Sequence, residues 1–192
     1  MKLIALGAFA LASLTAGTAS AQSAANITHG APIAGVCVYD NDEVLARSTA
    51  GQSVQTGMQR LLTEVQGELA PYASSIQTEL TALQQGGEAA DPGGTRRQAL
   101  QARAQEAQQL EQTRRTELQY TQGVQFQAIG TAVEPIVRAL YQERSCSILV
   151  NRSAIYSANP AMDITPTVIE RLNAALPSLS FNRLTPPVQP QQ

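Results

Sequence analysis

The fold is decided by residues 54–83, which read VQTGMQRLLTEVQGELAPYASSIQTELTAL. Apolar side chains recur in this stretch every three or four residues, and the pattern repeats after eleven. They are Val54, Met58, Leu61, Val65, Leu69, Tyr72, Ile76, Leu80 and Leu83. An eleven-residue repeat corresponds to about 3.67 residues per turn, close to a relaxed α-helix. The stretch therefore predicts one long, nearly straight helix with a single narrow apolar edge.

A second helix is predicted from residue 95 to about residue 144, after a Gly-rich loop at residues 84–94. Its apolar edge is formed by Leu118, Phe126, Ile129, Val133, Val137 and Leu140. Two long helices that are joined by a loop and carry one apolar edge each favour an antiparallel, coiled-coil-like hairpin. We assign this hairpin arm to residues 49–135. Pro71 and Pro135 lie inside the helices, where they either bend the arm or are absorbed by packing.

Short strand-like segments flank the hairpin. Residues 33–39 (IAGVCVY) and 147–150 (SILV) are apolar and β-branched, which is typical of strands. Residues 154–156 are a candidate third strand, and residues 48–51 (STAG) a predicted turn. The chain thus leaves a small sheet, runs out and back along the hairpin, and returns to the same sheet.

A terminal helix is predicted with Thr165 as its N-cap and Pro166 at the first helical position. Residues 33–48 and 136–177 then form a small discontinuous body, and the fold class is α+β. So small a body buries little surface, and we expect it to oligomerise through its sheet. The Pro- and Gln-rich tail, residues 178–192, is predicted to be extended and disordered.

The N-terminus predicts export. Residues 1–21 combine one basic residue, Lys2, with a short apolar run and the ending Ala19-Ser20-Ala21, which is typical of a cleaved signal peptide. The apolar run is shorter than the roughly 20 residues that span a bilayer. Residues 22–32 are small and polar and predict a flexible lead-in. We expect the mature chain to be exported and soluble.

Composition argues against several classes of function. The chain has 4% aromatic residues, no Trp, one His and two Cys. This leaves little for a zinc site or for histidine-based catalysis, and we expect no metal, no cofactor and no enzyme activity. A net charge of −2 also argues against a general nucleic-acid binder. Cys37 and Cys146 either form a disulfide, which export would permit, or remain buried thiols.

Two stretches carry a resemblance to a known family. GVCVYDNDEVLARSTAGQSVQ at residues 35–55 and SILVNRSAIYSANPAMDITPTVIERLN at residues 147–173, with a helical hairpin between them, resemble the Skp/OmpH family of periplasmic chaperones. The resemblance implies a periplasmic homotrimer with a β-barrel-like body and three helical arms around a cavity. It also implies an ATP-independent holdase that binds unfolded outer-membrane proteins and prevents their aggregation. The alternative is a structural coiled-coil envelope protein that acts as a spacer or docking rod.

The apolar edges have two interpretations within this resemblance: they either bind clients or close the hairpin. We favour the second, because each edge is narrow and a two-helix hairpin needs one seam. Clients would then contact apolar side chains beside the seam, for which the candidates are Leu62, Leu110, Tyr120 and Val124.

The charge of the chain departs from the resemblance, since well-studied members of the family are strongly basic. After cleavage the chain has 12 arginines against 15 acids, a net charge of −3. The arginines of the outer second helix are Arg96, Arg97, Arg103, Arg114 and Arg115. They either pair with Glu64, Glu68 and Glu79 of the first helix, which we favour, or make peripheral contact with anionic envelope lipid.

Overall fold

The structure is a computed structural model that describes residues 27–187. The chain divides into two units, residues 1–30 and residues 31–192, and the second carries the helices and strands described here. They are β1 (Val36–Tyr39), α1 (Asn41–Arg47), α2 (Thr49–Gly86), η1 (Gly87–Ala90), α3 (Thr95–Glu143), β2 (Ile148–Asn151), η2 (Arg152–Ala154), η3 (Pro160–Met162) and α4 (Thr165–Ala175), where η marks a 3-10 helix. The chain is therefore mostly helical with one small sheet. The predicted signal peptide and much of the lead-in lie outside the described residues, as do residues 188–192.

Side-chain caps start the first two helices. Asp40 Oδ1 accepts a hydrogen bond from the Glu43 N–H at 3.0 Å, and Ser48 Oγ accepts one from the Gly51 N–H at 3.0 Å. A Cβ atom at Gly51 would lie 1.8 Å from the carbonyl oxygen of Leu45, so the helices approach closely only because residue 51 lacks a side chain. The STAG segment therefore begins α2, and the predicted turn at residues 48–51 is wrong.

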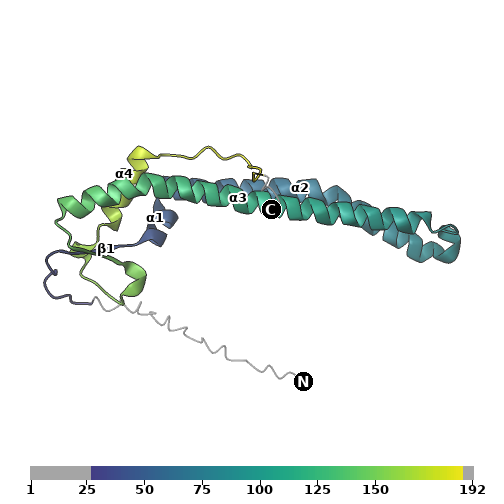
Figure 1. Cartoon of the computed structure of the whole chain (residues 1–192). Coiled ribbons are helices and arrows are strands. Elements are labelled where there is room, and N and C mark those ends of the chain that lie inside the picture. Colours follow the sequence, from purple (N-terminus) through teal and green to yellow (C-terminus); the bar gives the residue numbers. More distant parts are fainter. Residues whose placement is uncertain (1–26, 188–192) are drawn as a thin grey trace, which may run out of the picture. The chain divides into compact units, whose positions relative to one another are not determined.

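The two long helices, of 38 and 49 residues, lie side by side (Figure 1). Ion pairs join Glu79 to Arg96 and Glu68 to Arg114, so later residues of α2 contact earlier residues of α3. Both helices continue through their internal prolines, Pro71 and Pro135.

The connection between the long helices is shorter than predicted, because α2 continues to Gly86 and η1 follows directly. Asp91 closes the connection: its two carboxylate oxygens accept hydrogen bonds from the N–H groups of Arg96 and Arg97, each at 3.0 Å. Burial opposes the charged form of Asp91, but these bonds hold its pKa below the ordinary value. A carboxylate here also suits the positive end of the α3 dipole.

The small body, which we call the hub, is built on a parallel pair of strands. Val36 pairs with Ile148 and Cys37 with Leu149. A disulfide joins Cys37 to Cys146, with 5.7 Å between their Cα atoms. The main core combines the hub with the adjoining ends of the long helices and comprises Cys37, Val44, Ala50, Val54, Ile129, Val133, Leu140, Cys146, Ile164, Val168 and Leu172. The arm is therefore anchored in the hub through a shared apolar core.

Two details of the hub differ from the predictions. Residues 154–156 form no strand, because Asn151 Oδ1 accepts a hydrogen bond from the Ser153 N–H at 2.9 Å and turns the chain into η2. Thr165 is the first residue of α4 and not its N-cap. Its Oγ1 instead accepts a hydrogen bond from the Asp40 N–H at 2.9 Å and so ties α4 to the end of β1.

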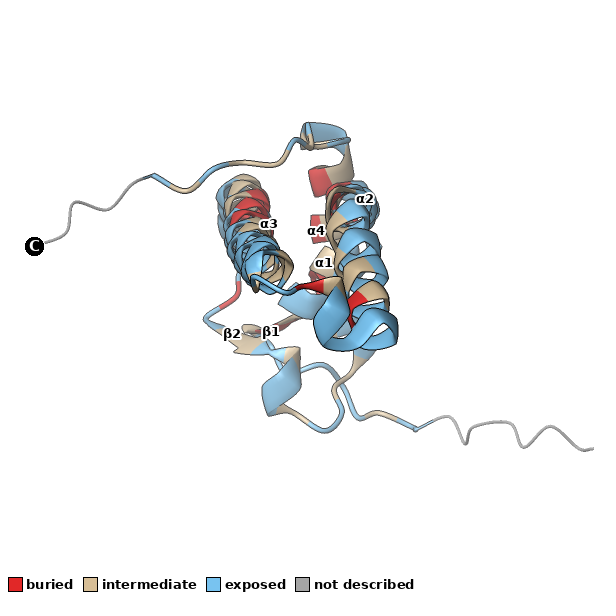
Figure 2. Cartoon of the chain, turned by 90° about the vertical axis from the view of Figure 1, so that its right-hand side faces the viewer, coloured by how far each residue is buried: buried red, intermediate tan, exposed pale blue. Residues whose placement is uncertain are grey.

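The predicted seam is buried only in part, as Figure 2 shows by colour. On α3 the buried line passes through Leu118, Thr121, Gln125 and Ile129, whereas Phe126 is 39% exposed. Leu80 of α2 is 38% exposed; the first half of α3 supplies mostly Ala, Gln and Arg, with few large apolar side chains such as Leu100 and Leu110. The assignment of these two residues, Leu80 and Phe126, to the seam is therefore wrong.

The segment after α4 differs from the predicted disordered tail. Residues 179–184, which we call the strap, lie against the arm: Leu179 and Phe181 pack on its apolar clusters, and Arg183 pairs with Glu68. The strap also explains why Thr121 is among the buried residues of α3, because the Leu184 N–H donates to Thr121 Oγ1 at 2.9 Å. The tail prediction is wrong for these residues.

Candidate functional site

An open groove lies on the arm between α2 and α3. Its apolar lining is Met58, Leu62, Val65 and Leu69 from α2 and Leu118 from α3. Its polar lining comes from α3 and consists of Glu111, Arg115, Gln119 and Gln122. The groove has a volume of about 280 Å³, and we call it the apolar groove.

The helical repeat explains how this groove arises. Residues four, three and four apart, beginning at Met58, lie on one face of α2. Leu61, Val65 and Leu118 form a small buried cluster that fixes the two helices together. Leu62, one residue beyond Leu61, is 47% exposed at the side of this cluster. The groove therefore has a packed floor and an exposed apolar wall.

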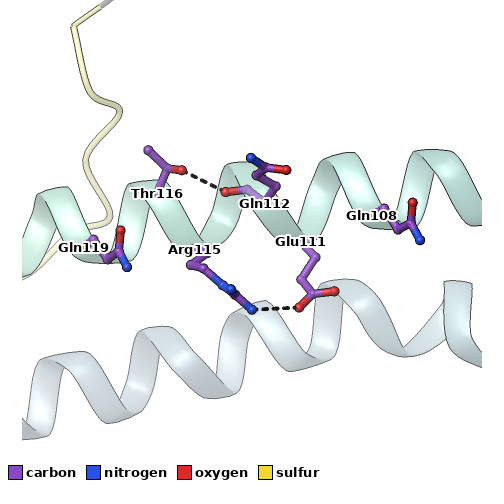
Figure 3. Close-up of a pocket in the computed structure, with 6 residues that line it drawn as sticks. All are labelled: Gln108, Glu111, Gln112, Arg115, Thr116 and Gln119. Atoms are coloured by element: carbon purple, nitrogen blue, oxygen red, sulfur yellow. Dashed lines mark hydrogen bonds and ion pairs between the residues drawn. The ribbon is translucent and has the colours of Figure 1, made fainter.

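A polar pocket on α3 adjoins the apolar groove (Figure 3). Its lining consists of Gln108, Glu111, Gln112, Arg115, Thr116 and Gln119. Arg115 Nη2 lies 3.3 Å from Glu111 Oε1, and Thr116 Oγ1 donates to the Gln112 carbonyl at 2.9 Å. Such an exposed ion pair contributes little to stability. The amides around it place hydrogen-bond donors and acceptors beside the apolar groove.

Four charged side chains, one of them from the strap, form a network on the arm. Arg114 Nε lies 2.6 Å from Glu68 Oε2, and Arg114 Nη1 lies 2.9 Å from Glu117 Oε2. Arg183 lies 2.8 Å from Glu68 Oε1 and 3.1 Å from Glu117 Oε2. The hydrogen bond from Arg183 holds the pKa of Glu68 below its ordinary value; desolvation opposes this effect and the bond from Arg114 adds to it.

Other arginines of α3 also have partners within the arm. Arg96 donates to both carboxylate oxygens of Glu79, at 2.6 and 3.0 Å, and its hydrogen bond lowers the pKa of that carboxyl. The guanidinium of Arg103 lies 4.2 Å from the centre of the Tyr72 ring. Arg96 and Arg114 are therefore paired inside the arm, as the favoured interpretation predicted. Glu64 is an exception to that prediction, because it pairs with Arg60 of its own helix.

The structure does not bring the four predicted client-contact residues together. Leu62 lines the apolar groove, and Leu110 is half-buried. Tyr120 is 37% exposed and Val124 is half-buried. They lie three residues after Glu117 and Thr121, which the strap contacts, so both flank the strap side of α3. Met58 and Leu69 were assigned to the seam alone, although their spacing from Leu62 already indicated a shared face.

The hub exposes apolar side chains of its own. Ile148 of β2 is 56% exposed and Tyr156 is 98% exposed. Within residues 27–187, no three His, Cys, Asp or Glu side chains cluster closely enough to hold a metal ion together. None of the helices in this part of the chain has the length and apolar character needed to cross a bilayer.

The comparisons with known proteins agree with this architecture. The family outer membrane protein (OmpH-like) matches residues 35–172. Among solved structures, the chain is similar to a candidate outer membrane chaperone (OmpH-like) from Caulobacter crescentus CB15, with 28% sequence identity and a TM-score of 0.72. The similarity covers 81% of this chain and 94% of that chain. No curated protein matches the chain.

Proposed function

The chain belongs to the OmpH-like family of outer membrane chaperones, and from this premise we propose that it is an ATP-independent holdase. Its clients would be unfolded outer-membrane proteins, which it binds and keeps from aggregating. The proposed compartment is the periplasm, which the signal-like residues 1–21 support.

The observation that carries the proposal is the apolar groove. It exposes Leu62 beside Met58 and Leu69 on a surface framed by glutamines and one ion pair. A volume of about 280 Å³ suits a few client side chains rather than a folded domain. A shallow apolar surface with adaptable polar neighbours gives weak contacts to many sequences, which is the behaviour that a holdase needs.

We further propose that α2 and α3 act as an antiparallel hairpin arm and that three copies assemble through their hubs. A two-stranded sheet is marginal by itself, and the hub leaves Ile148 and Tyr156 exposed, which assembly through the hubs would cover. Three arms would then surround the bound client. Arg96 and Arg114 pair with glutamates inside the arm, so their charge is already balanced. The proposal therefore does not include binding to anionic lipid.

The deciding experiment measures aggregation. A porin is diluted from urea into buffer, and light scattering is recorded with and without the mature chain at one trimer per client. We expect scattering to be suppressed without ATP. Undiminished scattering would remove the holdase function and leave the structural rod as the better account. Sedimentation equilibrium at micromolar concentration tests the trimer separately, and a stable monomer would contradict the assembly.

A further inference from the structure

The strap is held on the arm largely through its own main chain. Four arm side chains bind its backbone. Ser53 Oγ accepts from the Leu179 N–H at 3.3 Å and Thr121 Oγ1 accepts from the Leu184 N–H, whereas Gln125 Nε2 donates to the Ser180 carbonyl at 3.3 Å and Arg60 Nη2 donates to the Phe181 carbonyl. The strap contains no helix or strand. Recognition of backbone groups by side chains depends little on the sequence of the bound segment, so the same contacts are open to another extended chain.

Two side chains of the strap add a sequence preference. Phe181 occupies a notch at Gly57, where a Cβ atom would lie 2.2 Å from Cγ of the ring. Arg183 reaches the carboxylates of Glu68 and Glu117. Phe181 and Arg183 are two residues apart, and in an extended chain such residues lie on the same face. The arm thus recognises an aromatic residue followed two positions later by a basic one.

We propose that this surface, which we call the strap groove, is a second polypeptide-binding site of the arm and that the strap is its built-in occupant. The ligand is an extended segment with an aromatic residue and, two positions on, a basic residue. The proposal rests on the proposed holdase function, because the segments that displace the strap come from unfolded clients. The strap lies outside residues 35–172, the part that matches the family, so the family assignment gives it no role.

The contacts favour exchange over permanent docking. Phe181 and Arg183 are only partly buried, and no covalent link holds the strap beyond α4. A tethered segment competes at an effective concentration in the millimolar range, so a strap of low intrinsic affinity can still fill the groove. Outer-membrane β-barrels carry girdles of aromatic residues at both membrane interfaces, where a basic residue two positions on, on the same face, is tolerated; strand ends therefore offer segments of the required kind. Several client segments acting together could displace one strap.

The test compares the full chain with a strapless variant that ends at Leu179. Leu179 is kept because it packs against the main core, and circular dichroism checks folding. A fluorescent peptide of residues 178–185, SLSFNRLT, should bind the strapless variant more tightly than the full chain, in which the strap competes with it. If the strap fills its groove about nine-tenths of the time, the strapless variant should bind a urea-unfolded porin about tenfold more tightly.

A matched pair of glycine substitutions locates the binding. In the strapless background, Gly57→Ala should abolish peptide binding, because the new methyl group fills the notch. Gly67→Ala makes the same change in the same helix, where an added Cβ has no neighbour within 4 Å, and it should leave peptide binding unchanged. Both substitutions favour the helix, so neither should impair folding. A peptide carrying Arg183→Glu should bind at least tenfold more weakly.

Three results would overturn the inference. They are equal porin affinity of the full and strapless chains, equal effects of the two glycine substitutions, and unchanged hydrogen exchange at residues 179–184 of the full chain when porin binds. The exchange measurement needs no truncation and decides the matter if the strapless variant fails to fold. If the full chain suppresses aggregation but its strap stays protected, the holdase function stands and only the second site falls. If the full chain binds no porin at all, both fall.

Discussion

Leu61 and Leu62 provide a sharp test, because adjacent residues of one type have opposite roles. Leu61 is 1% exposed and belongs to the buried cluster with Val65 and Leu118. Leu62 is 47% exposed and lines the apolar groove. Replacing each with Ala removes the same atoms from the same turn of α2. The difference between the two variants therefore reports burial and not helix propensity.

The two environments predict different losses. A buried Leu→Ala change costs about 2–5 kcal/mol, and we expect about 2–3 kcal/mol for Leu61 because its small cluster lies close to solvent and can relax. Leu62 keeps about half of its surface in water, so Leu62→Ala should cost about 1 kcal/mol or less. Binding should show the reverse order. A loss of about 1 kcal/mol of client contact at Leu62 would weaken porin binding about fivefold.

Urea unfolding followed by circular dichroism measures the first quantity, with the protein concentration held fixed because association stabilises the chain. Porin titration of the folded variants measures the second. Leu61→Ala should shift the urea midpoint strongly and leave the affinity of the folded protein near wild type. Equal midpoint shifts for the two variants, or unchanged porin affinity for Leu62→Ala, would refute these roles, which are packing for Leu61 and client contact for Leu62.

Three further predictions concern stability. Cys37 and Cys146 are separated by 109 positions, and reduction of their disulfide should lower the free energy of unfolding by about 2–5 kcal/mol. The melting temperature should therefore fall when reductant is added, and an unchanged melting temperature would mean that the disulfide does not stabilise the fold. Gly51→Ala should destabilise the chain by at least about 1–3 kcal/mol in urea melts, despite the better helix propensity of Ala, because its Cβ would meet a backbone carbonyl. The pKa of Glu68 is lowered in the folded chain, so its contribution is complete above the unfolded pKa of about 4.3 and is lost as pH falls through the lower folded value. The protection of amides near Arg183 against hydrogen exchange, corrected for the intrinsic pH dependence of exchange, should therefore be unchanged between pH 7 and pH 5 and fall below pH 4. A loss of protection already at pH 6 would contradict this assignment.

The long helices could be predicted from sequence because their signal is local and repeated. A stripe such as Val54, Leu61 and Val65 recurs over many turns, and chance rarely maintains it. The two strands of one sheet were also predicted, since β-branched runs flank the hairpin at both ends; their parallel direction was not. The prediction of a third strand failed because the hydrogen bond that the Ser153 N–H donates to Asn151 Oδ1 redirects the chain at that point. Such a bond acts over two residues and leaves no periodic signal.

The line of burial on α3 could not be predicted for a different reason. Helical spacing permits either Gln122 and Phe126 or Thr121 and Gln125 beside Leu118, and hydrophobicity favours Phe126. The structure buries Thr121 and Gln125 because the strap supplies a hydrogen-bond partner to each of them. The choice depends on a segment more than 50 residues away, which composition alone marks as disordered.

Charge balance explains why the strap belongs where it lies. Glu117 is 6% exposed, and a buried carboxylate is stable only with opposite charge and hydrogen bonds around it. Arg114 stands three residues earlier, but Glu68 shares it, so these residues alone would leave two acids with one cation. Arg183 supplies the second positive charge and makes the network neutral. Displacement of the strap therefore exposes an acidic site that favours a basic residue in the incoming segment, which is why we expect binding there to weaken when that residue is Glu.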